Sequence, residues 1–200
     1  MSKRLILVLV VLMLVSPVLA KYSGGTGDVN DPYQIANVND LLAISEDANF
    51  ILTADIDFEN QELDSSICNF SGNLNGNHYT ISNVIFCEGG VFGSVNGVIE
   101  NLCLDNITVN EGSFYSFQGT GTLANENYGL IRNCNVTNSE IISSTFYYAG
   151  GLIGVNRGHI ENCSFQGEIY SPRGTVGGLM GRNLGSSDSI IRNCFTDCYI

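Results

Sequence analysis

The chain has 200 residues and carries 8 Lys and Arg against 20 Asp and Glu, a formal net charge of −12 at pH 7. Nucleic acids and anionic membrane surfaces are recognised through basic patches, so this balance argues against both as partners. The length fits one domain with an ample core.

Residues 1–20 are predicted to be a signal peptide. Lys3 and Arg4 precede the apolar run Leu5–Val15, and Val18–Ala20 offers a small-residue cleavage site. The run is shorter than the roughly 20 apolar residues of a membrane span, which favours cleavage over a retained anchor. Removing the leader leaves 6 basic against 20 acidic residues, a net charge of −14. We therefore expect a secreted or cell-surface protein with no membrane span after signal removal.

Residues 21–88 are predicted to form an N-terminal cap and the first coils of the fold. The entry loop Tyr22–Tyr33 contains Asp28, Asn30 and Asp31. Their oxygens suggest either a turn or a calcium site, but the spacing of an EF-hand loop is missing. The turn is favoured, and calcium at Asp28–Asp31 stays the alternative.

A short helix is expected over Asp40–Glu46, with Asn39 or Asn37 as its N-cap. Its apolar face would consist of Leu41, Leu42 and Ile44. One helix among strands is typical of a lid over the end of a stack of repeats, because terminal units need capping.

The next elements are predicted to be strands. Phe50–Phe58 alternates cleanly, with Asp55 and Asp57 on its polar face. These two carboxylates could form an acid/base pair, but a solvated strand face is the favoured interpretation. After a loop over Gln61–Asn69, the remaining predicted elements are a turn at Asn75–Gly76 and strands at Tyr79–Ile81 and Val84–Phe86.

Residues 89–200 contain four copies of one pattern. The copies are Gly89–Leu102, Gly121–Cys134, Gly150–Cys163 and Gly177–Cys194, and the last carries four extra residues at Ser186–Ser189. Apolar residues in each copy change parity at an Asn, so each unit should contain two or three short strands joined by bends. Units this short favour a parallel β-helix over a propeller, whose blades need about 40 residues.

Stacking the copies predicts four columns of equivalent residues. These are Val91-Leu123-Leu152-Leu179, Ile99-Ile131-Ile160-Ile191, Leu102-Cys134-Cys163-Cys194, and a ladder of Asn101, Asn133, Asn162 and Asn193 at the bend. Stacked Asn side chains can satisfy one another from coil to coil. A further column, Glu100-Arg132-Glu161-Arg192, predicts an alternating charge ladder on the outside.

These copies resemble the GLUG repeat of bacterial and archaeal surface proteins. Gly151-Leu152-Ile153-Gly154 and Gly178-Leu179-Met180-Gly181 carry the resemblance most closely, and Gly90–Gly93 and Thr122–Asn125 are looser copies. The resemblance covers nearly all of residues 22–200. It implies an all-β fold, a right-handed parallel β-helix, in a secreted or adhesin-like surface protein. It implies no catalytic residues.

Aromatic residues mark two linkers between the repeats, Thr108–Gly119 and Ser139–Ala149. They are Phe114, Tyr115 and Phe117 in the first, and Phe146, Tyr147 and Tyr148 in the second. Core stacking is the favoured role, and a carbohydrate-binding shelf is the alternative.

Seven cysteines are an odd number for an exported protein, and no C-x-x-C metal spacing is present. The Cys134-Cys163-Cys194 column favours a stack of small apolar side chains with at most one or two disulfides. The two histidines, His78 and His159, have no nucleophile motif beside them. Four glycosylation sequons begin at Asn69, Asn106, Asn135 and Asn162.

The pattern as a whole predicts a non-enzymatic secreted or cell-surface β-solenoid, structural or adhesive, that binds extracellular glycans or surface proteins. No catalytic, metal or cofactor site is predicted, and the ligand-binding residues are unknown. The alternative is a polysaccharide-active lyase or hydrolase on the same scaffold. The fourth copy ends without a cap, which predicts end-to-end association or continuation into a longer chain.

Overall fold

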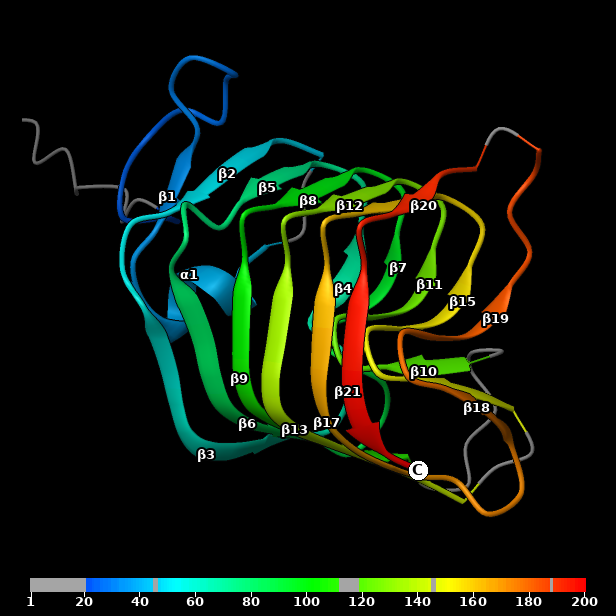
Figure 1. The fold of residues 1–200 in the computed structure, drawn as a ribbon. Helices are drawn as coiled ribbons and strands as arrows, with labels where there is room; N and C mark the ends of the chain where they lie inside the picture. Colours follow the sequence, from blue (N-terminus) through cyan, green and yellow to red (C-terminus); the bar gives the residue numbers. More distant parts are fainter. Residues whose placement is uncertain (1–20, 45–46, 112–118, 145–146, 188) are drawn as a thin grey trace, which may run out of the picture.

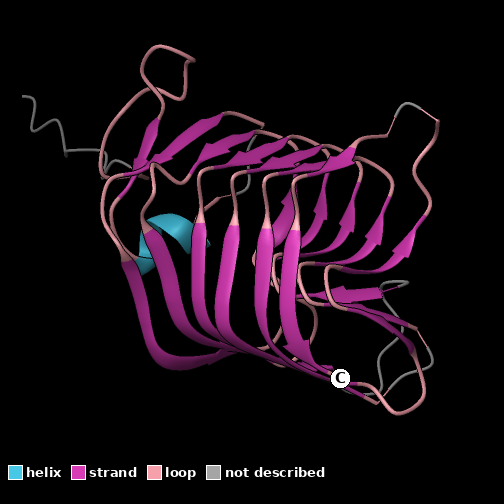
Figure 2. Ribbon diagram, viewed as in Figure 1, coloured by secondary structure: helices cyan, strands magenta, loops and turns pink. Residues whose placement is uncertain are grey.

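The computed structural model describes residues 21–44, 47–111, 119–144, 147–187 and 189–200. The predicted signal peptide lies outside these ranges. Within them the chain is a parallel β-solenoid with one short helix, and every pairing between its named strands is parallel. The predicted all-β fold class is confirmed (Figure 2).

Four sheets form the walls of the solenoid. Sheet 1 contains β1 (Tyr33–Ile35), β2 (Asn49–Leu52), β5 (Asn73–Asn75), β8 (Val98–Glu100), β12 (Leu130–Arg132), β16 (His159–Glu161) and β20 (Ile191–Arg192). Sheet 2 contains β3 (Ile56–Leu63), β6 (Thr80–Phe86), β9 (Cys103–Glu111), β13 (Asn135–Ser143), β17 (Ser164–Tyr170) and β21 (Phe195–Tyr199).

The other two sheets close the coil. Sheet 3 contains β4 (Cys68–Phe70), β7 (Phe92–Val95), β11 (Ala124–Asn127), β15 (Ile153–Asn156) and β19 (Met180–Asn183). Sheet 4 contains β10 (Gly119–Gly121), β14 (Tyr148–Gly150) and β18 (Thr175–Gly177). The three coils β8–β11, β12–β15 and β16–β19 therefore have four strands each, whereas the sequence predicted two or three per unit.

The coil is right-handed. The chain descends through sheet 2 at the front of Figure 1, rises through sheet 3 behind it, crosses sheet 1 at the top and advances from left to right. This direction of turning and advance defines a right-handed screw, as the family resemblance implied.

The core is the interior of this coil. The isoleucine column of sheet 1 is in register from Ile99 through Ile131 to Ile160, and all three side chains are fully buried. Ile191 continues the column but is 39% exposed, because no further described coil covers it. The predicted stacking of equivalent positions is confirmed.

An aromatic stack fills the N-terminal coils. Tyr22, Tyr33, Phe50, Phe70 and Phe92 follow one another with ring centroids 4.4, 5.7, 6.1 and 5.4 Å apart. The sequence prediction had placed core aromatics in the two linkers instead. Phe114, Tyr115, Phe117 and Phe146 lie outside the described residues, while Tyr147 and Tyr148 are half-buried.

The helix α1 spans Val38–Leu42, so it begins two residues earlier than predicted. Asn37 is its N-cap, and its side chain accepts a hydrogen bond from the backbone N–H of Asp40 at 3.1 Å. Leu41 is buried, but Leu42 is 38% exposed and does not belong to the apolar face. The helix lies at the N-terminal end of the stack, as a lid would (Figure 1). Glu46, the predicted end, lies outside the described residues.

Two further predictions in the first coils were wrong. Phe50–Phe58 is not one strand: β2 ends at Leu52 and β3 begins at Ile56, because the chain turns a corner from sheet 1 to sheet 2. Tyr79–Ile81 and Val84–Phe86 are not two strands but one, β6, with a bend at Asn83 (φ 56°). The first error arises because alternation continues across the corner between Leu52 and Ile56, and the second because the change of parity at Asn83 is a bend within one strand.

Candidate functional site

The repeated asparagines form the predicted ladder at the corner between sheets 1 and 2. Asn133 donates through Nδ2 to Oδ1 of Asn101 at 2.9 Å, Asn162 to Asn133 at 3.0 Å, and Asn193 to Asn162 at 3.0 Å. All four have φ of 53–54°, the left-handed conformation that Asn tolerates better than most residues. The ladder therefore serves the turn and the stack.

The glycines of the repeat make room for sheet 4. A Cβ on Gly154 would lie 2.3 Å from the backbone nitrogen of Thr120 in β10 of the preceding coil. Likewise, a Cβ on Gly181 would lie 2.7 Å from the backbone nitrogen of Ala149 in β14. The motif thus needs glycine where one coil packs against the sheet 4 strand of the coil before it.

The looser copy Thr122–Asn125 has a different residue at this position, and its surroundings explain why. Asn125 takes the place of this glycine in β11, where no described sheet 4 strand precedes it. The buried side chain of Asn125 lies where that strand would pack, and we call this position the glycine seat. Its Oδ1 accepts a hydrogen bond from the backbone N–H of Gly90 at 3.0 Å. The glycines are therefore structural, and function has to be sought elsewhere on the coil.

The charge column of sheet 1 is present as two separate pairs. Arg132 donates through Nε to Glu100 at 2.7 Å, and Arg192 donates to Glu161 at 2.9 Å. Both arginines are well exposed, so each pair contributes at most about 1 kcal/mol. This arrangement explains the column without any chemistry.

The predicted cysteine column is also present. Cys134 and Cys163 are buried, Cys194 is half-buried, and each thiol donates to the carbonyl two residues before it at 3.2–3.3 Å. A hydrogen bond with the Cys163 thiol, together with burial, holds the pKa of Cys134 well above its usual range. Counting thiols with and without reductant still tests the prediction of at most one or two disulfides.

The acidic residues that the sequence offered as metal ligands or as an acid/base pair have structural roles. Asp28 and Asp31 close a turn, with the backbone N–H of Asp31 donating to Asp28 O at 3.1 Å. Asp57 accepts from Asn83 and from the backbone N–H of Glu59, and these two hydrogen bonds lower its pKa. Within the described ranges, no three His, Cys, Asp or Glu side chains gather as metal ligands would.

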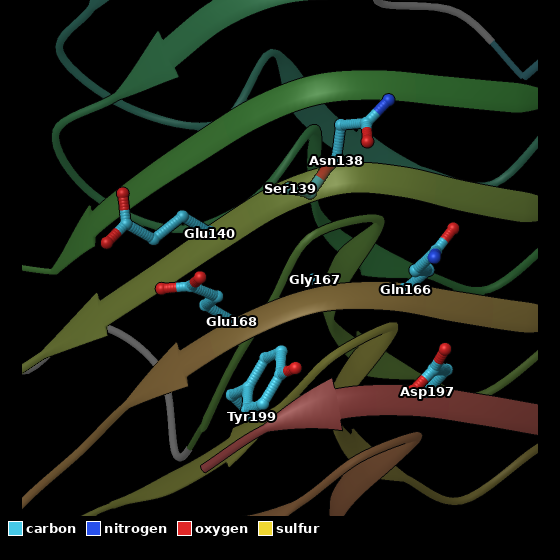
Figure 3. Close-up of a pocket in the computed structure, with 8 residues that line it drawn as sticks. All are labelled: Asn138, Ser139, Glu140, Gln166, Gly167, Glu168, Asp197 and Tyr199. Carbon is cyan, nitrogen blue, oxygen red and sulfur yellow. The ribbon is translucent and has the colours of Figure 1, made fainter.

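A hollow on the outside of the coil crosses sheet 2, and sequence reasoning missed it. We call it the outer trough; it has a volume of about 500 Å³. Its lining consists of Asn138, Ser139 and Glu140 from β13, Gln166, Gly167 and Glu168 from β17, and Asp197 and Tyr199 from β21 (Figure 3).

A bend in the strands produces the trough. Asn138 has a φ of 49°, and Ser139 turns inward, where its hydroxyl accepts from the backbone N–H of Ile107 and donates to Thr137 O. Gly167 pairs with Ser139, and a Cβ on it would lie 1.9 Å from Ser139 O. Sheet 2 therefore bends at the same height in neighbouring coils.

The trough is acidic and rich in hydrogen-bond acceptors. Glu140 and Glu168 are register partners on adjacent strands and lie side by side in Figure 3, and Glu168 is next paired with Tyr199. Asp197 and Gln166 are paired at the other end. No Lys or Arg belongs to the lining, so the carboxylates have no counter-ion from it. Two like charges on neighbouring strands are unfavourable for stability, which makes this pair worth explaining.

A second hollow of about 430 Å³ lies on sheet 1 beside the entry loop. Its lining includes Val29, Phe50 and the Glu100–Arg132 pair. The arginine and glutamate there already satisfy each other, so the outer trough is the better candidate site.

Comparison with known proteins places the motif within the coil. Residues 147–170, which run from just before β14 to the end of β17, match the family model of the GLUG motif. This segment is similar to the GLUG motif. Its Gly154 is the glycine that seats β10, and its last residues, Gln166 to Glu168, line the trough.

One curated relative and one solved structure are similar to the GLUG-bearing chain. Halomucin of Haloquadratum walsbyi is 32% identical over 151 residues; the match covers 66% of this chain and 2% of halomucin. The chain therefore spans only a small part of that relative. A crystal structure of a Bacteroides ovatus protein, described as a candidate immunoglobulin A1 protease, superposes with a TM-score of 0.67 at 25% identity. That match covers 88% of this chain and 59% of the other.

No helix in the described ranges is long and apolar enough to cross a membrane.

Proposed function

We propose that this chain is a module of a secreted or cell-surface β-solenoid protein that binds glycans in the outer trough without cleaving them. The GLUG motif and the similarity to halomucin support a structural role outside the cell. The repeated side chains of the coil are engaged in stacking, in ladders or in the seat of sheet 4, which leaves the outward, non-repeated residues to bind.

The lining of the trough carries the proposal. Carboxylates and amides accept hydrogen bonds from hydroxyl groups, and three carboxylates without a neighbouring cation in the lining offer many acceptors. Tyr199 is 81% exposed and presents a ring beside Glu168, on which the apolar face of a sugar can pack. A neutral, hydroxyl-rich ligand suits this surface better than an anionic polymer, which the carboxylates would repel.

A glycan array with the folded protein tests the proposal. We expect binding to neutral glycans, weakened about tenfold by Tyr199→Ala, since an aromatic contact of about 1.4 kcal/mol corresponds to a tenfold change in affinity. The Glu140→Gln/Glu168→Gln double variant should weaken it as well.

Glu62→Gln is the matched control, because Glu62 is an exposed carboxylate of the same sheet in β3, far from the trough along the stack. Its binding should equal that of the unaltered protein. Equal binding by all the variants, or no binding to any glycan, would contradict the proposal.

The second candidate function is a polysaccharide hydrolase. The observation in its favour is the Glu140–Glu168 pair on adjacent strands, because glycoside hydrolases act through two carboxyl groups that flank the scissile bond. Release of reducing ends from a polysaccharide, abolished by Glu140→Gln or Glu168→Gln, would favour this function over binding alone. A lyase that used Arg132 would instead lose turnover in Arg132→Ala.

A further inference from the structure

The four glycosylation sequons fall at exposed positions on three different surfaces of the coil. Asn69 lies in β4, Asn106 in β9, Asn135 in β13 and Asn162 at the corner after β16, and all four asparagines are exposed. Exposure alone therefore does not separate them. What separates them is the hydrogen bonding of each side-chain amide.

Two of the asparagines are rungs of ladders. Asn162 donates through Nδ2 to Asn133 at 3.0 Å and accepts from Nδ2 of Asn193 at 3.0 Å, so it has a neighbour on both sides. Asn106 donates through Nδ2 to Oδ1 of Asn83 at 2.7 Å. Both also have a positive φ, 53° and 52°, which fixes the side chain at a bend. Stacked positions in a parallel sheet are about 4.8 Å apart, so a sugar on Nδ2 would collide with the adjacent rung.

The other two asparagines use only the oxygen of the amide. Oδ1 of Asn69 accepts from the backbone N–H of Ser94 at 3.0 Å, and Oδ1 of Asn135 accepts from the hydroxyl of Ser164 at 2.9 Å. Within the described part of the chain, Nδ2 of neither residue has a hydrogen-bond partner.

Their surroundings leave space as well. Asn69 belongs to the edge strand of sheet 3, so only β7 lies beside it. Asn135 is paired with Cys103 on one side and Ser164 on the other, both of which have shorter side chains. A substituent on either Nδ2 can extend into solvent without displacing a ladder.

We propose that Asn69 and Asn135 carry N-linked glycans in the mature protein, and that Asn106 and Asn162 do not. In this modification Nδ2 loses one proton and forms a bond to the anomeric carbon of a sugar. The bond from that carbon to the phosphate of an activated, lipid-linked sugar donor breaks, and the phosphate leaves with the electron pair and takes up the proton. The folded structure keeps every hydrogen bond in which Asn69 and Asn135 take part.

Mass spectrometry of intact glycopeptides from the protein of the natural host tests this proposal. We expect occupancy at Asn69 and Asn135 to exceed that at Asn106 and Asn162 by about fivefold or more, since the loss of a rung removes at least one hydrogen bond of about 1 kcal/mol. Sugar at Asn106 or Asn162 at comparable occupancy, or no sugar at any of the four sites, would overturn it.

Variants that leave the ladders intact supply the control. Ser71→Ala removes the Asn69 sequon at an exposed hydroxyl, and Asn135→Gln removes the second site; each should lower the mass by one glycan. Thr108→Ala removes the Asn106 sequon without altering Asn106 and should leave the glycan mass unchanged. A loss of glycan mass in Thr108→Ala would contradict the assignment.

Discussion

At the scale of single residues, one position of the repeat explains how the GLUG pattern encodes packing. Gly154 and Gly181 face a sheet 4 strand of the preceding coil, and Asn125 takes the same position where no such described strand exists. Gly154 and Gly181 are required because a Cβ cannot enter the backbone of β10 or β14, and without the Asn125 side chain the N–H of Gly90 would lack its acceptor.

Gly154→Ala should therefore be strongly destabilising. The added Cβ meets backbone atoms at 2.3–2.4 Å, and backbone cannot move aside as a side chain can. We expect the free energy of unfolding to fall by about 1–3 kcal/mol or more, as for overpacked cores. Urea denaturation measures it.

Gly178→Ala is the comparison. Its Cβ would meet the Thr196 hydroxyl at 2.8 Å and the Cys198 sulfur at 3.0 Å, both of which are side-chain atoms in the last described coil. We expect a smaller loss than for Gly154→Ala. Similar losses in the two variants would contradict the account of the glycine seat.

The buried Cys134 thiol predicts a loss of stability at alkaline pH. Its pKa is raised in the folded state, above the value near 8.5 that an unfolded thiol has, so the folded state holds the proton more tightly. The contribution is complete below pH 8.5 and is lost as the pH rises from there toward the folded pKa. Between pH 8.5 and 9.5 one such thiol costs up to about 1.4 kcal/mol.

Cys134→Ala separates this effect from packing. The variant should be less stable at every pH, because a buried side chain is truncated, but its stability should fall less steeply above pH 8.5. Chemical denaturation at pH 7.5, 8.5 and 9.5 gives the comparison. An unchanged slope would show that the thiol titrates in the folded protein as it does in the unfolded chain.

At the scale of elements, the four aligned copies made much of the fold predictable. The isoleucine, cysteine and asparagine columns could be derived because corresponding residues recur at similar spacing. The first coils offered no such alignment, so the corner between Leu52 and Ile56 was invisible in a stretch that alternates throughout. The terminal helix was found through its capping residue, but its boundary was not.

Sheet 4 and the outer trough could not be predicted for a different reason. The strands of sheet 4 have three residues each and are rich in glycine, so they are too short for an alternating pattern to indicate a strand. The trough depends on a bend at Asn138 after which Ser139, a polar residue, points inward. When the inward-facing residue after such a bend is a serine, the pattern of apolar residues does not reveal the bend.

The four-residue insertion in the last copy is predicted to contribute little to the stability of the coil. Residues 186–189 lie between β19 and β20. Despite this insertion, Ile191 of β20 keeps its register with Ile160 of β16. Deleting these four residues restores the spacing of the other copies, so the unfolding free energy should change by less than about 1 kcal/mol, since loop length costs little.

Thermal unfolding followed by circular dichroism checks this deletion. Removing the four residues Gln166–Ile169 from β17 is the control and should abolish cooperative unfolding, because it deletes the core residue Ile169 and the middle of a strand paired on both sides. A collapse of the fold on removal of residues 186–189 would mean that this loop belongs to the stack.

At the scale of the whole molecule, the coil separates what repeats from what does not. The repeated residues hold the stack together, and the acidic outer trough arises from outward side chains of sheet 2 that lie outside the repeated columns: Glu140, Gln166, Glu168, Asp197 and Tyr199. A solenoid of this kind can present one binding surface on a rigid wall, and a longer protein built from such coils would repeat the wall while varying the surface.

The most direct test of this account measures binding and turnover of the same neutral polysaccharide by the same protein. Isothermal titration calorimetry gives the affinity, and the reducing ends released over a day give the turnover. The account predicts saturable binding that Tyr199→Ala weakens about tenfold, with no reducing ends above the rate without protein. Turnover that disappears in Glu168→Gln, or binding that is indifferent to Tyr199, would contradict it.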